Sequence, residues 1–81
     1  MAYGAAARNG LKGLEPGMRK RVVAKIEQYA HNPQSLANNV SAMTGDWAGL
    51  LRLRVGRARI IFVLWDESMK VLDIGLRGKI Y

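Results

Sequence analysis

The sequence lacks cysteine altogether, has a single histidine and contains few acidic residues. Without thiols the chain forms neither disulfides nor thiolate metal sites, and a reducing compartment suits it. The histidine, His31, precedes a helix-ending Asn-Pro pair, so it is expected at a helix C-terminus and not in acid–base chemistry. No apolar run has the form of a signal peptide or the length of a membrane span. We therefore expect a cytoplasmic protein with no membrane partner, no metal and no cofactor.

The charge is strongly one-sided. Thirteen Lys and Arg residues stand against six Asp and Glu, which gives a formal net charge of +7 on 81 residues. Such an excess points to a polyanionic partner, either nucleic acid, an anionic membrane or an acidic protein. A basic surface that serves only solubility is the alternative. The length and the 49% hydrophobic content predict one folded domain over residues 1–81.

Two helical segments are predicted in the first part of the chain. Residues 4–14 carry apolar side chains at spacings of four and three, which is the pattern of a short amphipathic helix. Residues 18–30 repeat the pattern with a longer apolar face, and the segment ends before Pro33 because proline restricts the residue before it. The break at 15–17 contains a proline suited to the first turn of a new helix. Together the segments predict a helical hairpin.

After polar, irregular sequence at 34–46, with a turn of helix expected near Leu36, the apolar period becomes that of strands. Strands are predicted at 48–55, 57–65 and 69–76. Their short gaps favour antiparallel hairpins. The run RIIFVLW is apolar at consecutive positions, which predicts a central strand covered on both faces. The predicted fold class is α+β, with a helical hairpin packed on an antiparallel sheet of three strands, or four.

Four arginines alternate along the first hairpin, LLRLRVGRARI. Alternate side chains of a strand share a face. A turn at Val55-Gly56 would place Arg54 opposite Arg57. It would likewise place Arg52 opposite Arg59, with all four guanidinium groups on one side of the sheet. Opposed like charges are unfavourable unless an anion lies among them, and guanidinium binds phosphate oxygens bidentately.

Two further features bear on this basic face. Arg77 joins it only if the loop after the second strand is odd-numbered, as a loop at 66–68 would be. A merely solvated face is the alternative, but such faces mix charges, and no acidic residue occurs between Asp46 and Asp66. Of the two tryptophans, Trp65 is predicted to be in the core, whereas Trp47 could stack a base.

Taken together, these motifs resemble the RelE/ParE superfamily of toxins from type II toxin–antitoxin systems. The similarity covers residues 7–81 and rests on the order of three segments, LKGLEPGMRKRVVAKIEQYAHNP, LLRLRVGRARIIFVLWD and VLDIGLRGKIY. The resemblance implies a RelE/ParE-like fold and a cognate antitoxin with an acidic amphipathic segment. RelE-like toxins cleave messenger RNA on the ribosome through the 2′-hydroxyl, without a metal or cofactor, whereas ParE-like toxins inhibit DNA gyrase.

The resemblance also implies roles for individual residues. The paired basic residues of the family's first long strand correspond to Arg52 and Arg54, expected to bind RNA phosphates. The arginines at the start of the central strand and after the last strand correspond to Arg59 and Arg77, expected to be catalytic phosphate clamps. The closing tyrosine corresponds to Tyr81, expected to stack a base or handle a proton; a ring that merely closes the core is the alternative.

The sequence departs from the family pattern in three places. Arginine replaces the lysines of well-known nucleases at positions 52 and 54, and arginine does not deprotonate in proteins, so neither residue is a general base. Arg57 and Ala58 replace an acidic and an aromatic residue, which adds Arg57 to the expected RNA-binding patch. The opening MAYGAAARNG is too short and too rich in Gly and Ala for the expected first strand. An unpaired sheet edge would follow, open to a homodimer or to a toxin–antitoxin hetero-oligomer.

Three hypotheses therefore arise from the sequence. The leading one is a ribosome-dependent endoribonuclease (an mRNA interferase) that halts translation. The second is a gyrase inhibitor without nuclease chemistry. The third is a degenerate toxin-like domain that binds only RNA or an antitoxin.

Overall fold

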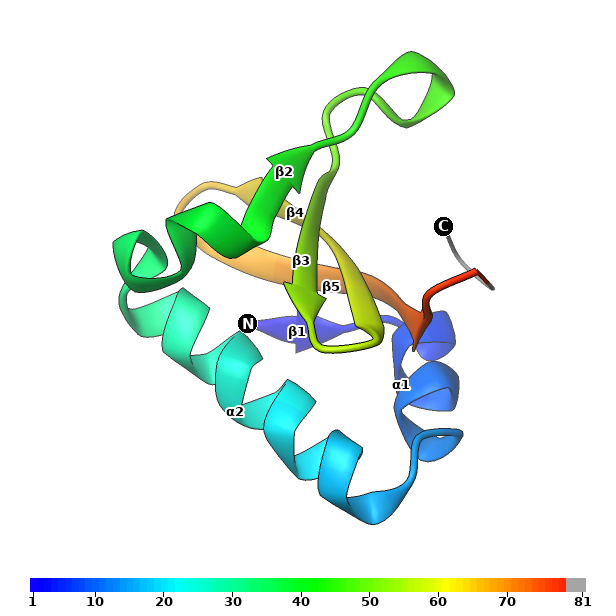
Figure 1. The fold of residues 1–81 in the computed structure, drawn as a ribbon. Coiled ribbons are helices and arrows are strands. Elements are labelled where there is room, and N and C mark those ends of the chain that lie inside the picture. The colour runs from blue at the N-terminus through cyan, green and yellow to red at the C-terminus, as the bar shows by residue number, and fades with distance from the viewer. Residues whose placement is uncertain (79–81) are drawn as a thin grey trace.

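The computed structural model describes residues 1–78 of the chain and has two helices on one face of a five-stranded sheet (Figure 1). The helices are α1 (Ala5–Lys12) and α2 (Pro16–His31), and the 3₁₀ segments are η1 (Pro33–Asn39) and η2 (Gly45–Trp47). The strands are β1 (Ala2–Tyr3), β2 (Val40–Ala42), β3 (Leu51–Val55), β4 (Ala58–Trp65) and β5 (Ser68–Leu76). The predicted helical hairpin, the turn of helix around Leu36 and the α+β class are confirmed.

The helical hairpin is closed by one side chain. Arg19, in the first turn of α2, donates from Nε to the carbonyl of Leu11 at 3.1 Å and from Nη2 to the carbonyl of Leu14 at 2.9 Å. These carbonyls lie at and just beyond the C-terminal end of α1, where carbonyl groups have no partner within the helix itself. No helix among the described residues is long and apolar enough to cross a membrane.

The sheet is larger than predicted. Its strand order is β1-β5-β4-β3-β2, with β1 parallel to β5 and the other pairs antiparallel. The prediction of three or four antiparallel strands was therefore wrong in detail, because β1 and β2 are only two and three residues long. Strands this short carry no readable alternation. The prediction that the first strand is missing was also wrong, since Ala2 and Tyr3 pair with Lys70 and Val71.

The first hairpin turns one position later than predicted. Val55 pairs with Ala58, so the turn residues are Gly56 and Arg57, not Val55-Gly56. Gly56 has a φ of +56°, a conformation that glycine adopts without strain at the first position of such a turn. Arg54 consequently lies opposite Arg59 and not opposite Arg57.

The second hairpin contains an irregularity that decides where Arg77 lies. Its two turn residues, Asp66 and Glu67, both have positive φ, so the loop is even-numbered and not the predicted 66–68. An even loop alone would send Arg77 to the helix side of the sheet. However, the register shifts between Ile61 and Phe62, which leaves Leu72 as an extra residue in β5. This bulge exchanges the two faces of the strand beyond it.

The core lies between the helices and the sheet. β4 is the central strand, as predicted, and its Ile60 and Phe62 are fully buried against α2 residues such as Ile26 and Tyr29. The prediction that both faces of this strand are covered was wrong, because Val63 on the outer face is only partly buried. The rings of Tyr29 and Phe62 pack edge to face with centroids 5.0 Å apart. At its far end β4 leaves the core, because Trp65 is 79% exposed, and the prediction that Trp65 is in the core was wrong.

Candidate nucleic-acid interface

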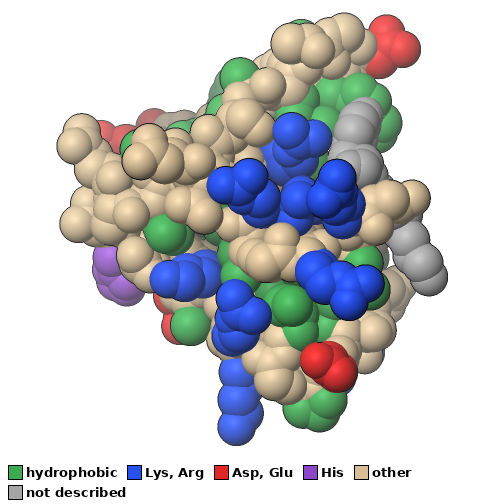
Figure 2. Space-filling view, viewed as in Figure 1, with side chains coloured by type: hydrophobic (Ala, Val, Ile, Leu, Met, Phe, Trp, Pro, Cys, Tyr) green, Lys and Arg blue, Asp and Glu red, His purple; other side chains and the backbone are tan. Residues whose placement is uncertain are grey.

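The face of the sheet opposite the helices carries the arginines. Arg52 and Arg54 alternate in β3 with the buried Leu53 and Val55, so their side chains leave the sheet on the outer side. Arg59 lies opposite Arg54, and the bulge places Arg77 beside the hairpin turn, where its N–H donates to the Arg57 carbonyl at 2.8 Å. We call Arg52, Arg54, Arg59 and Arg77 the arginine face. Figure 2 shows basic side chains gathered over the middle of the molecule.

Arg59 is the centre of this group. Its Nη1 donates to the carbonyls of Gly56 and Ala58, both at 2.9 Å, so the guanidinium is held against its own hairpin. Burial lowers the pKa of the Arg59 guanidinium below its ordinary value, and the positive charges of three neighbours lower it further. These neighbours are, in decreasing order of effect, Arg77, Arg54 and Arg52. The group therefore holds mutually repelling charges that an anion would stabilise.

No described carboxylate relieves this repulsion. Asp73 lies opposite Ile61 in the β4–β5 pair. Its Oδ1 accepts a hydrogen bond from the N–H of Ile74 at 2.9 Å and makes no ion pair with the arginine face. Within residues 1–78, no ion pair joins an acidic side chain to the arginine face. The same residues contain no cluster of His, Asp and Glu that could hold a metal ion. The chemistry available here is the binding of an anion by fixed positive charges.

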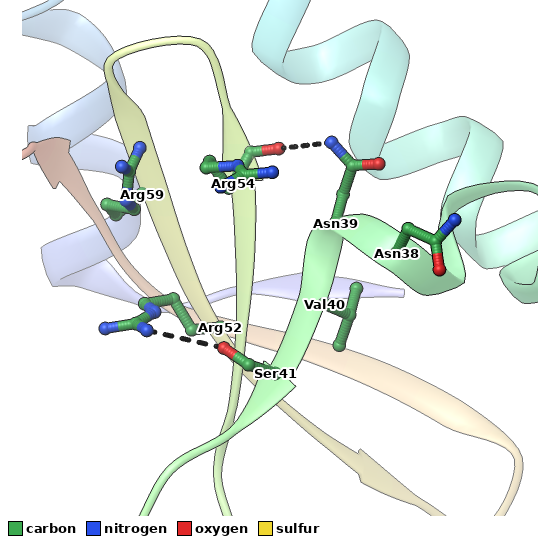
Figure 3. A pocket seen from close by; sticks show the side chains of 7 residues that line it. All are labelled: Asn38, Asn39, Val40, Ser41, Arg52, Arg54 and Arg59. Atoms are coloured by element: carbon green, nitrogen blue, oxygen red, sulfur yellow. Dashed lines mark hydrogen bonds between the residues drawn. The ribbon is translucent and has the colours of Figure 1, made fainter.

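A polar hollow of about 180 Å³ adjoins the arginine face between η1, β2 and β3 (Figure 3). It is lined by Asn38, Asn39, Val40, Ser41, Arg52, Arg54 and Arg59. Arg52 Nη2 donates to Ser41 Oγ and Asn39 Nδ2 donates to the Arg54 carbonyl, each at 3.4 Å. The hollow is smaller than the roughly 300–1,000 Å³ of pockets that enclose a whole small ligand. It suits one unit of a longer molecule.

The structure brings together most, but not all, of the residues that the sequence singled out. Arg52, Arg54, Arg59 and Arg77 converge. Arg57 does not join them, because as a turn residue it borders a different hollow with Glu15 and Met18, next to the helical hairpin. Its predicted position opposite Arg54 was therefore wrong, and its predicted role in binding RNA stays a prediction. Tyr81 lies outside the described residues.

Sequence reasoning missed the polar side chains beside the arginines. Asn38, Asn39 and Ser41 come from the segment read as irregular, and nothing in their local pattern indicates that β2 pairs with the arginine strand. Only the register of Ser41 opposite Arg52 brings them to the arginine face. His31 lies at the C-terminus of α2, as expected.

Solved structures share the fold of this chain. The toxin–antitoxin complex RelB-RelE from Methanococcus jannaschii aligns over 100% of this chain and 95% of the matched chain, with a TM-score of 0.79 and 23% identity. The archaeal RelE–RelB complex from Pyrococcus horikoshii OT3 aligns over 96% and 93%, with a TM-score of 0.76 and 21% identity. The chain has the RelE/ParE toxin fold.

The RelE/ParE fold extends to neighbours with less similar sequences. The YoeB/ParE toxin from Agrobacterium tumefaciens aligns over 94% of this chain and 95% of its own, with a TM-score of 0.76 and 13% identity. No protein-family model matches the sequence, and no curated protein matches it by sequence either. The likeness is thus one of backbone architecture, and the roles of the arginines have to be argued from their geometry.

Proposed function

We propose that this protein is the toxin of a bacterial toxin–antitoxin pair and that it cleaves messenger RNA on the ribosome. The observation that supports this most strongly is the convergence of Arg52, Arg54, Arg59 and Arg77 without a described acidic partner. Guanidinium groups bind the oxygens of phosphate bidentately, and closely spaced phosphates along an RNA strand can engage several of them at once. The toxin fold of the structural neighbours adds support. The activity places the protein in the cytoplasm, with translating ribosomes.

The proposed reaction needs the RNA, the arginine face and a base that takes one proton from the RNA. The 2′-oxygen attacks the adjacent phosphorus, the bond from phosphorus to the 5′-oxygen breaks, and a 2′,3′-cyclic phosphate and a 5′-hydroxyl result. The base removes the proton of the 2′-hydroxyl as its oxygen attacks, and a water molecule from the solvent gives a proton to the departing 5′-oxygen. Negative charge grows on the non-bridging oxygens in the transition state, where fixed positive charges stabilise it.

Each part of the arginine face has a role in this proposal. Arg59, already held by the carbonyls of Gly56 and Ala58, clamps the scissile phosphate together with Arg77. Arg52 and Arg54 bind neighbouring phosphates and position the strand. Arginine stays protonated and cannot act as the base. We therefore assign to Tyr81, which lies outside the described residues, the role of the base that takes the proton of the 2′-hydroxyl.

The same face suits a cognate antitoxin. An acidic segment laid across the arginine face would satisfy its charges and exclude RNA at the same time. The two neighbours solved as RelB-RelE complexes contain an antitoxin. We propose that antitoxin and RNA compete for the arginine face, in a toxin–antitoxin hetero-oligomer.

Primer extension on messenger RNA from translating ribosomes tests the nuclease. The wild-type protein is expected to produce cuts that require the ribosome, and Arg77→Ala is expected to abolish them. Lys20→Ala is the matched control, since Lys20 is an exposed cation on α2, at the opposite side of the sheet. Both variants are first compared with wild type by circular dichroism.

Two results would count against the nuclease. One is the absence of cuts with folded wild-type protein, and the other is equal cutting by wild type and Arg77→Ala.

The second candidate is gyrase inhibition without chemistry. It is favoured by one observation, that the arginine face has no side chain among the described residues able to act as a general base. Inducing the protein in cells separates the two candidates. A nuclease halts incorporation of labelled amino acids first, whereas a gyrase inhibitor first induces the DNA damage response.

A further inference from the structure

A second hollow adjoins the arginine face beside Arg52. It measures about 130 Å³ and lies between the end of β2 and the loop before β3. Its lining residues are Ala42, Met43, Thr44, Trp47 and Arg52. Arg52 therefore borders both this hollow and the Asn-lined hollow on its other side. The Arg52 guanidinium thus lies between two hollows, and each hollow is large enough for one unit of a polymeric ligand.

Trp47 is presented to solvent by a tied loop. The loop projects from the sheet on the side away from α2 (Figure 1). The backbone carbonyl of Trp47 accepts a hydrogen bond from the Leu50 N–H at 3.1 Å. The backbone N–H of Trp47 donates to the Thr44 carbonyl at 3.2 Å. A bond from Met43 N–H to the Leu50 carbonyl at 3.0 Å closes the loop at its base. Trp47 as a whole residue is 48% exposed, although tryptophan usually buries most of its surface.

We infer that Trp47 and Arg52 form a subsite for single-stranded RNA, in which a base stacks on the indole and the adjacent phosphate binds the guanidinium. This inference rests on the proposed RNA-binding function and adds a position to it. Proteins that hold single strands combine a basic track with aromatic rings on which bases stack. Along the outer side of the sheet, the Asn-lined hollow, Arg52 and the Trp47 hollow follow one another in this way.

The other tryptophan lacks this setting. Trp65 is more exposed, at 79%, but the hollow beside it lies at the far end of β4 and is lined by no residue of the arginine face. Exposure alone therefore does not distinguish the two rings. The two rings differ in that Arg52 of the arginine face borders the Trp47 hollow only, and this makes Trp65 a matched control for Trp47.

The test measures binding of a short single-stranded 2′-O-methyl oligoribonucleotide, which cannot be cleaved because its nucleophile is blocked. Trp65→Phe leaves Trp47 as the only tryptophan, and its fluorescence is expected to be quenched on binding. Trp47→Ala is expected to weaken binding about 5- to 150-fold, the range for loss of one stacked base. Trp47→Phe should restore part of the affinity, and Trp65→Ala should leave it within about twofold of wild type.

Salt dependence separates stacking from charge. Arg52→Ala should reduce the slope of log Kd against log salt by about 0.7, the value for one phosphate contact on a single strand. Trp47→Ala should leave that slope unchanged. Its loss of affinity should also be similar for adenine, uracil and cytosine homopolymers, because every base has a face to stack.

The possible failures are distinguishable. If Arg52→Ala and Arg54→Ala weaken binding while Trp47→Ala does not, the stacking subsite is wrong and RNA binding stands; the loop would then be tested against the antitoxin. Equal losses in Trp47→Ala and Trp65→Ala also overturn it. If wild type cuts RNA on ribosomes yet binds no oligonucleotide, the subsite fails and the nuclease stands. If wild type does neither, both proposals fail.

Discussion

The two faces of the β3–β4 hairpin differ more than any other two regions of the molecule. Toward the helices, Leu53, Ile60 and Phe62 are completely buried among apolar neighbours. On the outer side, Arg54 and Arg59 lie opposite each other and repel. In this pair of strands the inward-facing residues therefore stabilise the fold, whereas the outward-facing arginines destabilise it by charge repulsion. Stability and ligand binding should respond to different substitutions within the same strands.

The largest effect is expected on the helix side. Phe62→Ala should lower the free energy of unfolding by about 3–5 kcal/mol, because it leaves a cavity beside Tyr29 at the centre of the core. Leu64→Ala, in the same strand but 47% exposed, should change it by less than about 0.5 kcal/mol. Urea titrations followed by circular dichroism measure both. Similar losses in the two variants would show that the core does not centre on Phe62.

A smaller loss is expected where α1 meets the sheet. A Cβ added to Gly10 would overlap the backbone carbonyl of Ile74, so Gly10→Ala should cost about 1–3 kcal/mol through overpacking. Gly17, in the first turn of α2, has open space around it, and Gly17→Ala should stabilise by about 0.4–1 kcal/mol. The pair is compared by thermal and urea unfolding. A stabilising Gly10→Ala would contradict the close approach of α1 to β5.

Substitutions on the outer side should act oppositely on stability and on binding. Arg54→Gln should weaken binding of the oligoribonucleotide roughly tenfold. In the absence of RNA it should raise the free energy of unfolding by about 0.2–1 kcal/mol, because it removes repulsion from Arg59. Arg57→Gln should weaken binding less than Arg54→Gln, since Arg57 lies in the turn. Equal losses of affinity would place Arg57 back in the RNA-binding patch.

The smallest effect concerns pH. Burial, and then the nearby carboxylate of Glu27, raise the pKa of Tyr3 above its ordinary value. A raised pKa in the folded state means that the unfolded chain releases its proton first as pH rises. The resulting stability is fully present below pH about 10 and is lost as pH rises through the folded pKa. In Tyr3→Phe, the free energy of unfolding should therefore fall less steeply between pH about 9 and 11. If the free energy of unfolding falls equally steeply with pH in wild type and in Tyr3→Phe, the raised pKa of Tyr3 is contradicted.

Local patterns in the sequence predicted the long elements well. The helical hairpin and three strands follow from apolar spacing, because each element buries a continuous stripe. The short strands β1 and β2 could not be predicted, because two or three residues show no alternation and gain their place only by pairing with β5 and β3. Trp65 was misassigned for a related reason, since apolar character continues past the point where the strand leaves the core.

The candidate site was predicted in its residues more than in its geometry. Alternation put Arg52 and Arg54 on one face, but a one-residue error in the turn placed Arg57 wrongly opposite Arg54. The even number of residues in the second loop would by itself place Arg77 on the helix side of the sheet. The extra residue Leu72 in β5 returns it to the arginine face. A bulge depends on long-range packing, so the sequence offers no local sign of it. The polar residues Asn38 and Asn39 depended on the same kind of unseen pairing.

The pairing of β1 with β5 also sets when this chain can finish folding. Ala2 lies beside Lys70, and the N–H of Gly4 donates to the Val71 carbonyl at 2.8 Å, so β1 can pair only after the much later strand β5 has been synthesised. Closing so long a loop is slow compared with forming the helices. During translation, at about 5–20 residues per second, α1 has no sheet to pack on until β5 is available. A chain interrupted before β5 lacks Arg77 and a partner for β1, so it cannot assemble the complete arginine face.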